Sequence, residues 1–217
     1  MNQIIAEKLA LIAENEQKVY DKGKTDGTAE GYQSGYTEGY TAGYAEGEAS
    51  GGGGSDFPAN DFFSKTATEI TMTGVTILGQ YSIYQYSTLE TVYLPDTTNI
   101  SSNAIFNCSN LSNVVMSEGL ITIGSSGNVF SACPNIKNLE IPSTVESIGR
   151  SAFTGLAGLE TVTFLGTPKT IGTGGGTTVF SASLKTIYVP WVENDPTAPA
   201  GAPWGATGAT IIYPEED

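Results

Sequence analysis

One short pattern of apolar residues recurs along the C-terminal part of the chain, and this repeat constrains the fold more than any other feature. Its clearest copy spans 136–159, where Leu139 and Ile141 alternate with polar residues, as in a strand buried on one face. Pro142 has no N–H to donate, so it ends that strand before the pattern restarts. Copies begin at positions 89, 111, 136, 159 and 184, which are 22, 25, 23 and 25 residues apart. Such a period predicts a solenoid in which each unit buries its apolar face only by stacking on the next.

Each copy predicts one short strand, followed by a turn and an aromatic residue that returns to the interior. We expect all of the strands to lie in one parallel sheet, with the apolar faces of the coils inside. The expected strands are 92–94, 114–116, 139–141, 162–164, 187–189 and 211–213. The aromatic residues expected to stack inside the solenoid are Phe106, Phe130, Phe153 and Phe180.

The copies share a string that resembles a known repeat family. The string L-x-x-[VIL]-x-[ILF]-P-x-x-[VI]-x-x-I-G-x-x-[AV]-F-x-x-C-x-x-L is similar to the BspA-like leucine-rich repeat over roughly residues 67–190. The resemblance implies a solenoid of the kind found in bacterial surface proteins and in phage and prophage proteins of gut bacteria. The stretch 187–213 is similar to the terminal cap of prophage-encoded members. The consensus cysteine of the family implies that Cys108 and Cys133 are stacked, buried, reduced thiols, with a disulfide as the alternative.

Composition limits the partners of the chain. Its 217 residues include 9 Lys and Arg and 23 Asp and Glu, a formal net charge of −14, so no nucleic-acid partner is expected. The chain has no histidine, which removes the commonest general base and metal ligand. No apolar run reaches the ~20 residues that span a bilayer, so membrane insertion is not expected. The start of the chain is acidic from position 7 and lacks a basic region, which argues against a secretory signal and favours a virion component over a cell-wall adhesin.

The first fifty residues predict a long helix that associates with copies of itself. Apolar residues within 2–22 have coiled-coil spacing, and eight glycines continue the same register at every fourth residue from 23 to 51. An isolated helix would lose about 1 kcal/mol per glycine, so close approach of partner helices must offset this cost. We therefore expect a homo-oligomer, most simply a trimer, that also contacts other virion proteins; a flexible Tyr/Gly tract is the alternative. The residues assigned to oligomerisation are Ile5, Leu9, Ile12, Val19, Gly23, Gly27, Gly31, Gly35, Gly39, Gly43 and Gly47.

These patterns predict an α+β chain, in which a long oligomerising N-terminal helix is followed by a BspA-type leucine-rich repeat β-solenoid. The helical oligomerisation and attachment segment covers 1–49, with a heptad seam and then a GxxxG stripe, and a Gly/Ser linker covers 50–58. The solenoid covers 59–217, with an N-terminal cap at 59–70 and a C-terminal cap at 190–217. In the second cap, Trp191 and Trp204 are expected to shield the last coil, and a sugar platform is the alternative.

Little in the sequence supports catalysis, and we expect no enzymatic activity, cofactor or metal. Serine and threonine are abundant, but no histidine is available to activate them. The glycine-rich stretch 172–176 lacks the Lys-Ser/Thr that would make it a phosphate loop. Glu140, Glu146 and Glu160 could pair carboxylates for glycoside hydrolysis. However, Glu140 and Glu160 fall at outward strand positions that need no special role.

The outward strand positions provide the candidate binding site. Stacking the copies makes one regular column of Thr and Asn, which we interpret as structural. A second column is irregular, as expected where a solenoid places recognition. From this second column we select Tyr93, Glu140 and Tyr188 as ligand-binding residues.

These expectations lead to a functional hypothesis. We expect a phage virion structural protein, a fibre, tail or capsid decoration protein, whose solenoid projects outward and binds a host surface or glycan. The expected location is then the phage particle. The alternative is a bacterial BspA-type surface adhesin, located at the cell surface.

Overall fold

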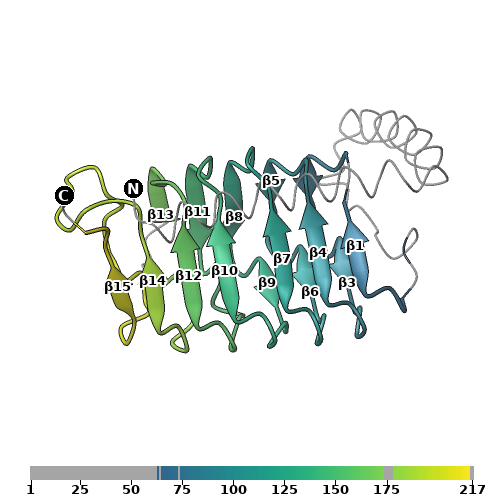
Figure 1. Cartoon of the computed structure of the whole chain (residues 1–217). Helices are drawn as coiled ribbons and strands as arrows, with labels where there is room; N and C mark the ends of the chain where they lie inside the picture. Colours follow the sequence, from purple (N-terminus) through teal and green to yellow (C-terminus); the bar gives the residue numbers. More distant parts are fainter. Residues whose placement is uncertain (1–62, 64, 73, 174–177, 216–217) are drawn as a thin grey trace.

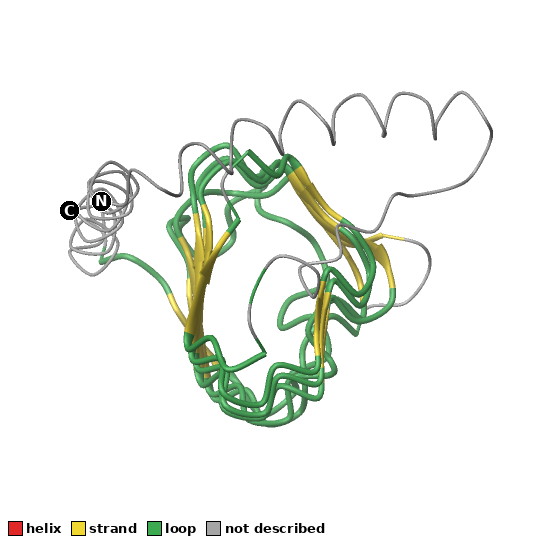
Figure 2. Ribbon diagram, turned by 90° about the vertical axis from the view of Figure 1, so that its right-hand side faces the viewer, coloured by secondary structure: helices red, strands yellow, loops and turns green. Residues whose placement is uncertain are grey.

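The chain forms a parallel β-solenoid, in a computed structural model that describes residues 63, 65–72, 74–173 and 178–215. Successive coils stack along one axis, with their strands running parallel (Figure 1). Viewed along the solenoid, the strands of different coils superpose in groups around one closed cross-section (Figure 2). The solenoid expected from the repeat is therefore confirmed.

The strands expected from the repeat form one face of the solenoid. Each of these expected strands starts one residue earlier than predicted. On this face lie β1 (Glu69–Thr71), β4 (Thr91–Leu94), β7 (Asn113–Met116), β10 (Asn138–Ile141), β12 (Thr161–Phe164), β14 (Thr186–Tyr188) and β15 (Thr210–Ile212). The expectation of one sheet is wrong, because the strands divide into the sheets β1-β4-β7 and β10-β12-β14-β15. Just beyond β7 and β10, hydrogen bonds to a side chain join the coils. The Glu118 carboxylate accepts hydrogen bonds from the backbone N–H groups of Ser143 and Thr144, at 3.1 and 3.2 Å.

The coils also carry strands that the repeat did not predict. A second sheet, ordered β13-β11-β8-β5-β2, and a third, ordered β3-β6-β9, complete the cross-section. The second sheet contains β2 (Ile77–Leu78), β5 (Asn99–Ile100), β8 (Thr122–Ser126), β11 (Ser147–Arg150) and β13 (Thr170–Thr173). The third contains β3 (Ile83–Tyr84), β6 (Ile105–Phe106) and β9 (Phe130–Ser131). Several of these strands have only two residues, which is too short to show an alternating pattern in the sequence.

The predicted α+β class is wrong, because the described residues contain strands and turns but no helix. Their backbone groups bond mainly between coils, as in the bond from Tyr81 N to Asn103 O at 2.9 Å, which leaves no run of helical bonds within a coil. The predicted helix 1–49, its oligomerisation residues, the linker 50–58 and part of the cap 59–70 lie outside the described residues. Within the described part, no helix could cross a membrane.

The core is a set of inward columns, one of which is aromatic. Phe130, Phe153 and Phe180 stack, with ring centroids 6.1 and 5.4 Å apart. The expectation that Phe106 continues this stack is wrong, because Ile105 lies opposite Phe130. Phe106 lies opposite Ser131 instead and is half-buried on the outer side. The spacing explains the register: Ile105 lies three residues before Cys108, as Phe130 does before Cys133.

Trp191 and Trp204 shield the last coil of the core, as expected for these two residues. The indole of Trp204 is 5.7 Å from the ring of Phe164 and 6.3 Å from that of Phe180. The Trp204 carbonyl accepts the Val179 N–H at 2.8 Å, which ties the cap to the preceding coil. Trp191 and Trp204 are only 7% and 1% exposed, so neither offers a free ring face as a sugar platform.

Candidate functional site

The structure places the three predicted ligand residues on outward strand positions but does not bring them together. Tyr93 on β4 lies opposite Val115, in the sheet β1-β4-β7. Glu140 on β10 and Tyr188 on β14 both lie opposite Thr163, one on each side of it. All three predicted residues are half-buried, whereas Thr163 between the latter two is 5% exposed. The predicted column therefore exists, but it does not form one compact site.

The neighbouring column of threonines and asparagines also lies as the sequence predicted. Thr91 is opposite Asn113, and Thr161 is opposite Asn138 on one side and Thr186 on the other. Side chains that repeat in register on a sheet stabilise it by packing against each other across the strands. We interpret this regular ladder as structural.

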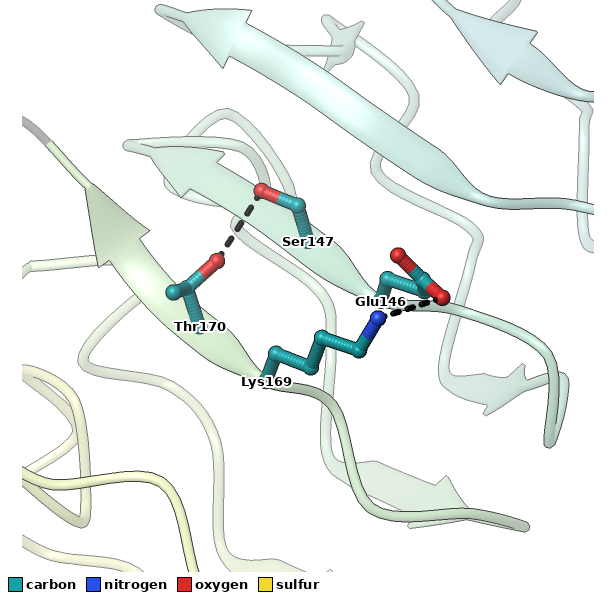
Figure 3. Close-up of polar contacts among 4 residues, drawn as sticks. All are labelled: Glu146, Ser147, Lys169 and Thr170. Carbon is teal, nitrogen blue, oxygen red and sulfur yellow. Dashed lines mark hydrogen bonds and ion pairs between the residues drawn. The ribbon is translucent and has the colours of Figure 1, made fainter.

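Polar ladders also join the coils on the second sheet and at the first face. Figure 3 shows Lys169 Nζ bound to Glu146 Oε1 at 2.7 Å and the Thr170 hydroxyl donating to Ser147 Oγ at 3.1 Å. Lys185 Nζ similarly lies 3.0 Å from Glu160 Oε2, and this hydrogen bond lowers the pKa of the Glu160 carboxyl. Two of the three carboxylates that the sequence offered for glycoside hydrolysis, Glu146 and Glu160, thus each bind a lysine of the next coil. Both ion pairs are solvent-exposed, so they contribute little to stability.

The two cysteines lie inside the solenoid on adjacent coils. Cys108 and Cys133 are free and fully buried. A side-chain hydrogen bond with Cys108 raises the pKa of the Cys133 thiol well above its usual range, and burial acts in the same direction. The same hydrogen bond lowers the pKa of the Cys108 thiol. Stacked, buried thiols were the arrangement implied by the family resemblance.

A surface cluster of three aromatic side chains was missed by the sequence analysis. Tyr81, Tyr84 and Phe106 contact one another with ring centroids 5.6–5.8 Å apart. Tyr81 stands edge-on to both other rings, while Tyr84 and Phe106 stack across β3 and β6. Tyr81 is 43% exposed, and the other two are half-buried. The missed signal was the three-residue spacing to Cys108, which assigns Ile105 to the core and Phe106 to the surface.

The described part of the chain has no group of three or more His, Cys, Asp or Glu side chains placed to hold a metal ion. Residues 174–177 of the glycine-rich stretch lie outside the described residues.

Comparisons with known proteins agree with the repeat. A family model described as BspA type Leucine rich repeat region, in 6 copies, matches residues 55–187, more than half of the chain. No curated protein matches the chain.

Two solved structures are similar to it at low identity. A leucine rich cell surface protein from Faecalibacterium prausnitzii A2-165 is 17% identical with a TM-score of 0.45, over 71% of this chain and 34% of that protein. A leucine-rich repeat protein from Bacteroides ovatus ATCC 8483 is 15% identical with a TM-score of 0.29, over 68% of this chain and 55% of that protein. The chain thus spans about a third and about half of these two proteins, and neither likeness bears on function.

Proposed function

Because this chain belongs to the BspA-type leucine-rich repeat family, we propose that its solenoid is a non-catalytic recognition domain of a bacterial surface protein, which binds a glycoprotein on a host surface. Repeats of this type occur in bacterial surface proteins, as the sequence resemblance implied. The bacterial surface protein was the alternative reading of the sequence, and the family favours it over a phage fibre.

One observation carries the proposal: the inward columns are uniform, whereas an outward column changes its chemistry from coil to coil. Inward positions on the first face hold Val92, Val114, Leu139, Val162 and Ile187, all buried. The outward column next to them holds Tyr93, Val115, Glu140, Thr163 and Tyr188, which are in turn aromatic, aliphatic, acidic, hydroxylic and again aromatic. Packing of the core restricts the first set to apolar residues. It places no such restriction on the second set, so the outer surface is free to be shaped by a ligand.

Binding of the full chain to mucin tests the proposal. The chain would be immobilised and exposed to purified gastric mucin, with serum albumin as the unglycosylated control protein. We expect saturable binding of mucin and none of albumin. Equal signals from the two proteins, or no binding of mucin, would contradict the proposed function.

The narrower predictions from the sequence stay predictions. They are a phage fibre, tail or decoration role, and assembly into a homo-oligomer. The residues assigned to assembly, from Ile5 to Gly47, lie outside the described residues. The proposed recognition by the solenoid does not depend on them.

A further inference from the structure

We propose that Tyr81, Tyr84 and Phe106 form a platform that binds an uncharged glycan. This inference rests on the proposed recognition function and assigns it a site and a ligand class. The three rings pack against one another with centroids 5.6–5.8 Å apart, and all keep part of their surface in solvent. Aromatic faces pack well against the C–H surface of a sugar ring, and the two tyrosine hydroxyls add hydrogen-bonding groups at the edge of the cluster.

The backbone at Tyr81 does not favour a bulky side chain. Tyr81 has a left-handed φ of 58°, and the equivalent residues of other coils, Asn103 and Ser151, have φ values of 53° and 61°. Asparagine is enriched in this conformation, whereas a bulky residue there is unusual. Tyr81 is also the one aromatic residue among the exposed large hydrophobic residues of the described chain. A residue type that the local backbone disfavours, and that packing of the core does not require, is expected at a functional position.

Tyr84, Phe106 and Ser131 form one outward column, and only its first two positions are aromatic. Tyr84 lies opposite Phe106, which in turn lies opposite Ser131. The inward neighbours Ile83, Ile105 and Phe130 are fully buried, so the core is closed whether an aromatic or a serine occupies the outer position. The rings at Tyr84 and Phe106 are therefore not needed to cover the core.

The chain segments that carry the cluster contain no charged residue, although the protein is strongly acidic. The runs 70–89, 97–117 and 119–136 contain no Asp, Glu, Lys or Arg, although the whole chain has a net charge of −14. The nearby ammonium of Lys65 is already engaged, because it donates to the Tyr84 carbonyl and lies 4.0 Å from the centre of the Tyr86 ring. The exposed amides of Gln85 and Asn107 directly follow Tyr84 and Phe106 in the chain. Neutral rings flanked by amides and hydroxyls match a neutral, hydroxyl-rich ligand.

The size of the cluster favours a glycan over a protein partner. A stable protein interface buries roughly 800 Å² on each partner, contributed by about 20–30 residues. Three side chains, two of them half-buried, cannot provide such an area. They can cover one or two sugar rings.

The test uses residues that the solenoid itself places at equivalent positions. Tyr81→Asn introduces the residue found at Asn103, and Phe106→Ser introduces the residue found at Ser131, so both changes suit the local backbone. Ile121→Thr is the control, because Ile121 is 44% exposed, lies outside the cluster, and its backbone N–H bonds to the carbonyl of Thr98 in the preceding coil, which already carries a threonine there. The probes are the neutral and the acidic oligosaccharides released from gastric mucin, each titrated into the full chain and followed by NMR. Circular dichroism and thermal unfolding confirm that each variant is folded.

We expect the neutral oligosaccharides to bind the wild-type chain and the Ile121→Thr chain alike. We expect Tyr81→Asn to weaken binding at least about tenfold, as for loss of a central aromatic contact, and Phe106→Ser to weaken it as well. Acidic oligosaccharides should bind poorly to this acidic protein. The inference is overturned if neutral oligosaccharides do not bind, or if Tyr81→Asn binds them as the wild type does.

Intact mucin separates this inference from the proposed function. Unchanged mucin binding by Tyr81→Asn would remove the platform and leave the recognition function in place. Loss of mucin binding in this variant, with full binding of deglycosylated mucin by the wild type, would replace the glycan by a protein partner and overturn the inference. Failure of the wild-type chain to bind mucin at all would contradict the proposed function itself.

Discussion

Phe153 and Phe106 show how one position in the register decides the role of a phenylalanine. Phe153 is fully buried between Phe130 and Phe180, whereas Phe106 is half-buried against Tyr81 and Tyr84. We predict that Phe153→Ala lowers the free energy of unfolding by about 3–5 kcal/mol, because it removes a ring from a packed core. Phe106→Ala should lower it by only about 1 kcal/mol, as at a partly exposed site. Urea unfolding of both variants measures the two free energies of unfolding. Equal losses of free energy would contradict the register that places Phe153 in the core and Phe106 on the surface.

The paired thiols predict a pH dependence of stability. The pKa of Cys133 is raised in the folded protein, whereas in the unfolded chain a cysteine titrates near ~8.5. Above that pH the unfolded chain releases a proton that folded Cys133 keeps, so this group's contribution to stability is constant below about pH 8.5 and falls above it. Cys133→Ala alone would also remove the hydrogen bond that lowers the pKa of Cys108, so the test replaces both thiols. We expect the decline between pH 8 and 9.5, followed by urea unfolding under reducing conditions, to be shallower in the double variant Cys108→Ala/Cys133→Ala. An identical slope in the wild type and the double variant would rule out this role of the thiol pair.

At the scale of the strand, the sequence could predict the elements in which burial alternates over several residues. The four-residue strands β4, β7 and β10 alternate buried and outward positions, so they were found with an error of one residue. The four-residue strand β11 was missed because it buries the neighbours Ile148 and Gly149 and does not alternate. The strands β2, β3, β5, β6 and β9 have two residues each, and a pair of residues carries no period. The aromatic cluster was missed for a related reason: in β6, Ile105 and Phe106 are adjacent apolar residues, and only the spacing to Cys108 tells which one is inside.

The turns between strands hold the coils at a fixed separation, and glycine permits the closest approaches. A Cβ added at Gly158 would lie 1.9 Å from the carbonyl oxygen of Pro134 in the previous coil. One added at Gly208 would meet no atom within 4 Å. We predict that Gly158→Ala destabilises the protein by at least about 2 kcal/mol, because the backbones of two coils must separate. Gly208→Ala should be neutral or slightly stabilising. Thermal unfolding compares the two, and a tolerated Gly158→Ala would contradict the close coil contact.

At the scale of the whole molecule, a uniform core supports a surface that differs from end to end. The first coils combine the aromatic cluster with uncharged runs, whereas the ion pairs Glu146–Lys169 and Glu160–Lys185 lie on later coils. The sequence could predict which columns face outward, because strand alternation determines that. The order of the copies also places Tyr93, Glu140 and Tyr188 on separate coils. The sequence could not predict that Tyr81, Tyr84 and Phe106 meet, because that contact depends on the turns and short strands between the repeats.

The central claim is that the protein recognises its ligand through outward-facing residues of the solenoid. NMR chemical-shift mapping of the full chain, titrated with glycopeptides released from gastric mucin by protease, tests it most directly. The account predicts that the perturbed residues lie at outward positions of the coils within 59–217, with Tyr81, Tyr84 and Phe106 among the most affected. Perturbations confined to residues 1–58, or none at a saturating concentration of glycopeptide, would contradict it.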